Sequence, residues 1–183
     1  VVITEKDENE ETVESEIFVP LGISTSIQNW IFSIVSNLNR IIPHTLPKSI
    51  HLQIVSHLTT QLLEHYEKLS KSEFANENQK AAWQFLFDLK VLSLLFVGRE
   101  NKLMNEKYTQ IINHFRGVID PFDYDVFYKH VSVNIKKCAT RLQFIAGVLV
   151  PNMEYLNGIL TNQNVPVTHD KDPNILIMSA PPT

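Results

Sequence analysis

Sulfur and glycine are both scarce in this chain of 183 residues, which contains one cysteine, Cys138, and five glycines. One thiol cannot form an internal disulfide or a cysteine-based zinc knuckle, so we expect a reducing, cytosolic setting. None of the glycines belongs to a phosphate-binding loop or to the glycine–serine–glycine elbow of a hydrolase. The sequence therefore predicts neither of these two kinds of enzyme.

Long apolar runs are missing as well. Charged residues such as Asp88, Lys90 and Arg99 interrupt the longest apolar stretches well before the roughly 20 residues that a membrane span requires. We therefore expect a soluble chain whose membrane association is indirect, through partners.

Acidic residues are concentrated at the N-terminus, where residues 1–16 contain seven acids and one base, Lys6, a local charge of −6. Subtracting this from the net charge of −4 leaves +2 for the rest of the chain, which is too little for a nucleic-acid footprint, so we expect no nucleic acid as a partner. We interpret residues 1–16 as an irregular acidic linker. Because the chain starts at Val1 without a leader, we expect it to be a piece of a longer protein.

Apolar residues recur at spacings of three and four between proline breaks, as in amphipathic helices. The pattern predicts helices at about 24–42, 47–69, 78–97, 103–117 and 122–150. Strand signals are confined to residues 17–21 and 175–178. We therefore predict an all-α fold, a bundle of about five antiparallel helices over residues 17–150. An irregular tail, rich in proline and asparagine, should follow over residues 151–183.

The helix expected at 78–97 has more apolar surface than one face can use. Trp83, Phe87 and Leu94 form a second apolar face, which leaves two interpretations open. The helix is either central in the bundle, or this face is a partner interface. Asp88 lies between the two faces and must find a hydrogen-bond or ion-pair partner inside the fold.

Acidic residues Asp120, Asp123 and Asp125 open the last helix. Asp120 is placed to cap it, with Pro121 at its first position and Asp123 near the positive end of the helix dipole. A calcium loop would need a glycine and a distal glutamate that the segment lacks. The seven histidines are scattered. We therefore predict no catalytic residue, no metal site and no cofactor.

The last helix also has a basic side, formed by Lys129, Lys136, Lys137 and Arg141. This side is either a solvated surface or a second candidate interface for an acidic partner or anionic lipid headgroups.

Ordered blocks of residues between about 17 and 149 resemble the C-terminal part of subunit 1 of the conserved oligomeric Golgi complex. The blocks are weak singly and specific together: WIF at 30–32, NR at 39–40, LPK at 46–48, YEKL at 66–69, FLFDLK at 85–90, IDPFDYDVF at 119–127 before His130, and PNIL at 173–176. Two residues depart from the pattern, Lys90 in place of arginine and Tyr124 in place of leucine. Lysine cannot form a bidentate ion pair at position 90, whereas tyrosine keeps the bulk of leucine.

The resemblance implies a non-enzymatic, rod-like helical subunit of a vesicle-tethering complex. Such a subunit would join other subunits by helix packing, on the cytoplasmic face of the Golgi membrane. Its role would be in intra-Golgi retrograde transport, which keeps glycosylation enzymes in place. An alternative is a helical domain that binds a lipid or small molecule, which would require a cavity of several hundred Å³ inside the bundle.

Overall fold

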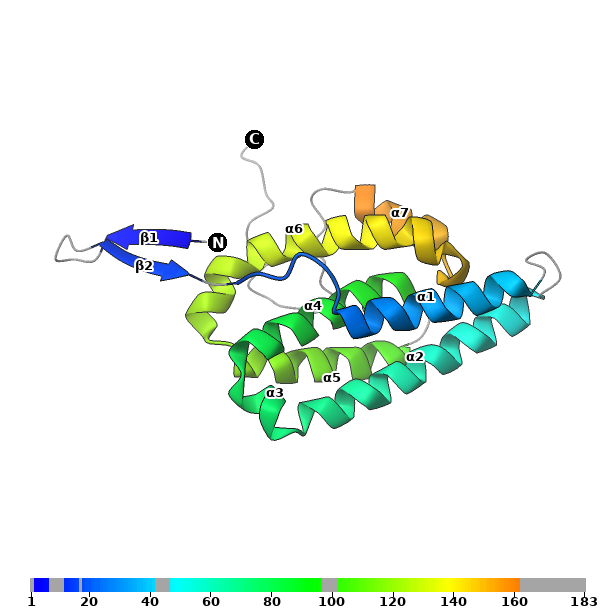
Figure 1. Ribbon diagram of the computed structural model, residues 1–183, viewed down its shortest axis with the longest axis horizontal. Coiled ribbons are helices and arrows are strands. Elements are labelled where there is room, and N and C mark those ends of the chain that lie inside the picture. The colour runs from blue at the N-terminus through cyan, green and yellow to red at the C-terminus, as the bar shows by residue number, and fades with distance from the viewer. Residues whose placement is uncertain (1, 7–11, 17, 42–46, 97–101, 162–183) are drawn as a thin grey trace.

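The computed structural model describes residues 2–6, 12–16, 18–41, 47–96 and 102–161, and these residues form a helical bundle with a small hairpin (Figure 1). The predicted all-α fold is confirmed, and the five expected helices correspond to α1, α2, α4, α5 and α6. In chain order the elements are β1 (Val2–Lys6), β2 (Thr12–Glu16), α1 (Thr25–Arg40), α2 (Lys48–Ser70), α3 (Glu73–Glu77), α4 (Gln79–Phe96), α5 (Lys102–Val118), α6 (Pro121–Ala146), the 3-10 turn η1 (Gly147–Leu149) and α7 (Met153–Thr161).

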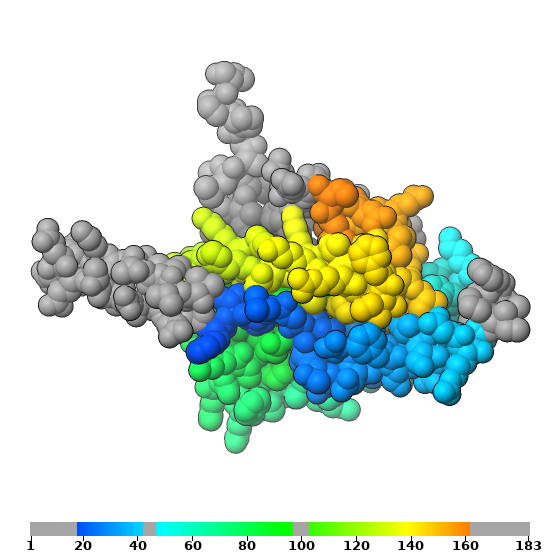
Figure 2. All heavy atoms as spheres, turned by 45° about the horizontal axis from the view of Figure 1, so that its top comes forward, coloured from blue at the N-terminus to red at the C-terminus, as the bar shows by residue number. Residues whose placement is uncertain are grey.

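Helix α6 lies on the outside of the bundle. Figure 2 shows it in yellow, with α1 and the extended residues 18–24 along one side and α7 in orange on the other. Its start is fixed as the sequence predicts, because the Asp120 carboxylate accepts hydrogen bonds from the backbone N–H of Phe122 at 2.9 Å and of Asp123 at 3.3 Å. The α-helix ends at Ala146 and tightens into η1, since Pro151 cannot continue it.

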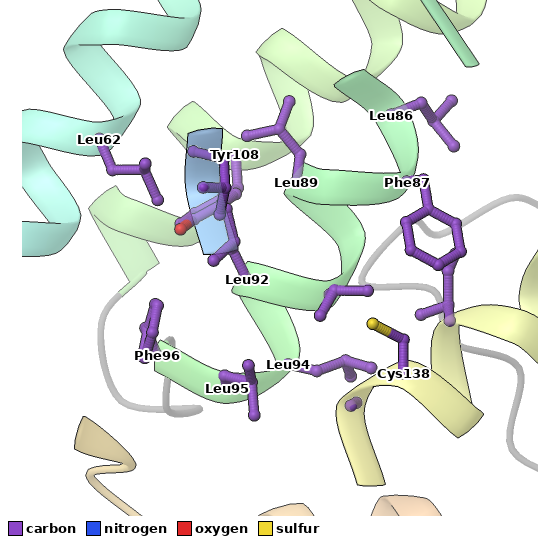
Figure 3. Close-up of a cluster of buried hydrophobic side chains, with 14 of the residues drawn as sticks. Leu62, Leu86, Phe87, Leu89, Leu92, Leu94, Leu95, Phe96, Tyr108 and Cys138 are labelled. Atoms are coloured by element: carbon purple, nitrogen blue, oxygen red, sulfur yellow. The ribbon is translucent and has the colours of Figure 1, made fainter. Parts of the chain in front are cut away.

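Helix α4 lies at the centre, packed against α5, α6, α2 and α3. Figure 3 shows Leu62 of α2 and Tyr108 of α5 on one side of α4, and Cys138 of α6 on the other. Every α4 side chain from Leu86 to Phe96 is buried. Each large apolar side chain removed from water stabilises the fold by about 1.5–3 kcal/mol, so α4 contributes the largest share of the core.

The N-terminal segment is not irregular, contrary to the prediction. Strands β1 and β2 pair antiparallel, with Val2 opposite Glu16 and Lys6 opposite Thr12. The acidic composition favoured a linker, but Val2, Ile3, Thr4, Thr12 and Val13 are β-branched and favour extended backbone. Of the two strand candidates in the sequence, residues 18–21 are described and form no strand, and residues 175–178 lie outside the described residues.

The prediction of an irregular tail over residues 151–183 is also wrong for its first part, because residues 153–161 form α7. Asn152 caps this helix by accepting a hydrogen bond from the backbone N–H of Tyr155 at 3.0 Å, and Leu156 is fully buried. Composition averaged over residues 151–183 concealed one short amphipathic helix among prolines. The remaining part of that tail, residues 162–183, lies outside the described residues.

Candidate partner interface

The face of α4 that the sequence offered as a partner interface is buried inside this bundle. Trp83, Phe87 and Leu94 are 1%, 0% and 4% exposed. Phe87 and Leu94 lie on the side of α4 that faces Cys138 of α6 (Figure 3). The interface prediction for these three residues is therefore wrong, and the alternative of a central helix is correct. A helix that is apolar all round needs neighbours on every side, and α2, α5 and α6 of the same chain supply them.

An aromatic stack joins α4 to the start of α6. The Trp83 and Tyr124 rings are parallel within 10°, with centroids 5.8 Å apart, and Tyr124 stacks in turn on Tyr128 at 4.7 Å. The Arg116 guanidinium of α5 lies 4.6 Å from the Tyr124 ring centroid. Tyr124, which replaces the leucine expected from the resemblance, therefore packs as a flat ring between two others and holds three helices together.

Asp88 is a structural hydrogen-bond acceptor, as predicted. Its Oδ2 accepts a hydrogen bond from the Tyr66 hydroxyl of α2 at 3.0 Å, and its Oδ1 accepts from the Ser24 backbone N–H at 2.9 Å and from Gln84 Nε2 at 2.8 Å. Burial raises the pKa of Asp88, while the hydrogen bonds from Ser24, Gln84 and Tyr66 oppose that rise. One carboxyl group thus ties α2 and the start of α1 to α4.

Residues 18–24, here called the strap, are fixed along one side of α6. Asn134 Nδ2 of α6 donates a hydrogen bond to the Pro20 carbonyl at 3.0 Å, and Gln84 Nε2 donates to the Gly22 carbonyl at 3.0 Å. These contacts join the strap to both α6 and α4. They leave the opposite edge of α6 to another element.

Helix α7 occupies that opposite edge. Gln143 Nε2 of α6 donates to Asn157 Oδ1 at 2.5 Å and contacts Met153 Sδ at 3.2 Å. The part of α6 between the strap and α7 is hereafter called the outer face.

Three of the four basic residues predicted for an interface are exposed on the outer face: Lys129, Lys137 and Arg141. The fourth, Lys136, is half-buried and has an interaction of its own. The sequence therefore placed the basic side correctly.

The outer face also contains large apolar side chains that the sequence analysis missed. Phe122, Val133 and Phe144 are 54%, 51% and 85% exposed. The sequence signal for these three side chains is their spacing of eleven residues. Eleven residues make three helical turns plus about 20°, so the three side chains lie nearly in line along the helix. The more regular spacing of the buried residues of the same helix, such as Phe127, Val131 and Ile135, hid that second pattern.

Neither of the two cavities found among the described residues is an enclosed space of several hundred Å³, as lipid or small-molecule binding would require. The cavity lined by Trp30, Val55, Leu58 and neighbouring side chains has a volume of about 10 Å³, room for about one water molecule. A larger space of about 450 Å³ is an open groove between α2 and α5, with the charged residues Glu64, Glu67 and Lys107 in its lining.

The described residues contain neither a metal-binding cluster nor a membrane-spanning helix. Within the described ranges, no group of three or more histidine, cysteine or acidic side chains is placed to hold a metal ion. No helix among them combines the length and the apolar character needed to cross a bilayer.

Three curated proteins that are similar to the chain have the same name and come from three organisms. The chain is 32% identical over 183 residues to conserved oligomeric Golgi complex subunit 1 of Drosophila melanogaster, a match that covers 98% of this chain and 20% of that protein. The chain is similar to subunit 1 of the conserved oligomeric Golgi complex. The human subunit 1 is 27% identical over 159 residues, 80% of the chain and 16% of that protein. The resemblance inferred from the ordered blocks is thus confirmed.

The match is limited in extent. The chain spans 20% of the Drosophila subunit 1 and 16% of the human subunit 1. No family model matches the chain, and no solved structure matches it.

Proposed function

We propose that this chain is part of a structural subunit of a Golgi vesicle-tethering complex, and that it joins other subunits through helix packing in intra-Golgi retrograde transport. The observation that carries the proposal is the 32% identity to a Golgi complex subunit over 98% of the chain. The fold supports it, because a central α4 makes a rigid bundle that can present its outer helices without rearranging.

The proposed mechanism is burial of helix surface, without catalysis and without a cofactor. The partners would be other subunits of the same complex, and nucleic acid would not be among them. Membrane association would be indirect, with the assembly peripheral on the cytoplasmic face of the Golgi. The joining unit within the chain would be the bundle of residues 18–161, and residues 1–16 would precede it as a separate appendage.

The test uses the full-length protein that contains this chain, tagged and expressed in cells lacking the endogenous copy. We expect it to co-purify with the other tethering subunits, to localise to the Golgi and to restore surface glycosylation measured by lectin binding. Phe87→Asp, which places a charge in the core, should remove the contribution of this bundle and reduce all three. The control is Phe74→Asp, at a side chain on α3 that is 62% exposed.

A full-length protein that recovers no tethering subunit would contradict the proposal. So would a Phe87→Asp protein that is unfolded in this bundle yet supports assembly and glycosylation as well as the Phe74→Asp control.

A further inference from the structure

Three of the four exposed large apolar residues of α6, Phe122, Val133 and Phe144, form a straight line along its outer face, and the fourth, Ile145, lies about 100° round the helix from Phe144. Steps of eleven residues rotate the line by about 20° each, so Phe122, Val133 and Phe144 cover about 40° of the helix circumference. At 1.5 Å per residue the line is about 33 Å long, or about six turns. A line of this shape matches the contact of two helices that lie side by side.

After Asp125, which is exposed near the start of α6, charge on the outer face has one sign. Residues 126–150 contain four cations, Lys129, Lys136, Lys137 and Arg141, and no acid. Lys129, Lys137 and Arg141 are exposed, and no ion pair among the described residues engages them. At 100° per residue, Lys137 falls within 40° of both Val133 and Phe144, so its cation accompanies the apolar line over the same turns.

We propose that the outer face of α6 docks a single amphipathic helix of another subunit, with its apolar side chains against Phe122, Val133 and Phe144 and its acidic side chains beside Lys129, Lys137 and Arg141. This deepens the proposed function by naming the surface and the chemistry of the partner. Apolar contact supplies the affinity, and the cations set which helix binds and in which direction. The strap and α7 border the site on either side.

A membrane surface fits the outer face less well. An interfacial helix needs a wide apolar face that enters the acyl region, with its cations at the margins. Here the apolar line is narrow, and Lys137 lies among its members. A partner helix satisfies both features, because its carboxylates can meet the cations while its apolar side chains remain in the line.

The test places a photo-crosslinking phenylalanine analogue at position 144 of the full-length protein, in cells that lack the endogenous copy. Phe144 is the most exposed large apolar residue of the outer face, so an aromatic analogue leaves the fold intact. We expect a crosslink to a tethering subunit, within a peptide of net negative charge that has apolar residues at spacings of three and four.

Charge reversal provides the second arm. Lys137→Glu combined with Arg141→Glu should lower recovery of the crosslinked subunit at least about tenfold, and changing the acids of the identified peptide to lysine should restore it. The control is Lys68→Glu, at an exposed lysine on α2. All variants should melt within about 2 °C of the wild type, because the substituted side chains are on the surface.

The outcomes separate this inference from the proposed function. If the wild-type protein co-purifies with the tethering subunits but the double reversal leaves their recovery unchanged, the docking site on α6 is refuted and the proposed function stands. A crosslink to lipid, with binding to phosphatidylserine vesicles lost on charge reversal, also refutes the helix and assigns the face to membrane. If no tethering subunit co-purifies with the wild-type protein, both proposals fail.

Discussion

Helices α4 and α6 are both rich in large apolar residues, yet they have opposite relations to the solvent. Helix α4 is buried around nearly its whole circumference, including the face that looked surplus in the sequence. Helix α6 buries one side, with Phe127, Val131 and Ile135, and leaves a second apolar line in water. In α4 the excess of apolar residues belongs to a central helix, whereas the thin apolar line between cations on α6 is the surface that we propose for a partner.

The largest loss of stability is expected from a substitution in α4. Phe87→Asp puts a charge where the native side chain is 0% exposed, so it should lower the free energy of unfolding by about 4 kcal/mol or more. Urea denaturation of the chain, followed by circular dichroism, measures the loss. A midpoint close to that of the wild type would show that α4 is not the core.

The next prediction compares substitutions on the buried side and on the exposed side of α6. Leu142, 6% exposed, points into the bundle, whereas Phe144 two residues later points out. Leu142→Asp should therefore cost about 3 kcal/mol in the same denaturation experiment. An equal response of positions 142 and 144 to aspartate would remove the distinction between an inner and an outer side.

A third prediction concerns the polar link from α4 to its neighbours. Asp88→Ala leaves the donors from Tyr66, Ser24 and Gln84 without their acceptor and should cost about 2–3 kcal/mol. Asp88→Asn keeps one oxygen for Ser24 and Gln84, so it should cost less. If the alanine and asparagine variants unfolded at the same urea concentration, the hydrogen bonds would not contribute as described.

Comparison of the wild type with Asp88→Asn also predicts how stability depends on pH. Burial raises the pKa of Asp88 above its ordinary value of about 3.9, so near that pH the native chain keeps a proton that the unfolded chain has released. The wild type should therefore lose stability relative to Asp88→Asn as pH rises from about 4 through the native pKa. A difference that stayed flat, or that changed in the opposite direction, would contradict the raised pKa.

The smallest effect on stability is expected on the outer face. Phe144→Asp should change the free energy of unfolding by no more than about 0.5 kcal/mol, because the side chain is 85% exposed. The matched comparison with Phe87→Asp uses the same substitution on the two helices. A cost above about 2 kcal/mol at position 144 would mean that the outer face belongs to the core.

Much of the fold could be predicted from local signals in the sequence. Pro47 precedes α2, Pro151 follows η1, and Asp120 with Pro121 opens α6 at the expected residue. Elements with weak or mixed signals were missed. Helix α7 depends on one Asn152 cap within a proline-rich composition, and the hairpin depends on pairing between two short acidic segments.

The candidate site was less predictable, for a physical reason. Whether Trp83 is core or interface depends on how many helices surround α4, and that number follows from the packing of distant segments. The basic residues of α6 could be found from their helical spacing. The eleven-residue spacing of Phe144 from Val133 is present in the sequence, but the positions of the strap and α7, which decide which side of α6 stays exposed, depend on tertiary packing.

Cysteine labelling tests directly whether assembly covers the outer face of α6 and leaves the rest of the bundle accessible. Val133→Cys places a thiol on the outer face, and Leu103→Cys places one at a 69% exposed position of α5, on the other side of α4. In full-length protein, maleimide labelling at each position is measured by mass spectrometry with and without the other subunits. We predict that assembly protects position 133 and leaves position 103 reactive. Equal labelling of position 133 in the free and assembled protein would contradict the account.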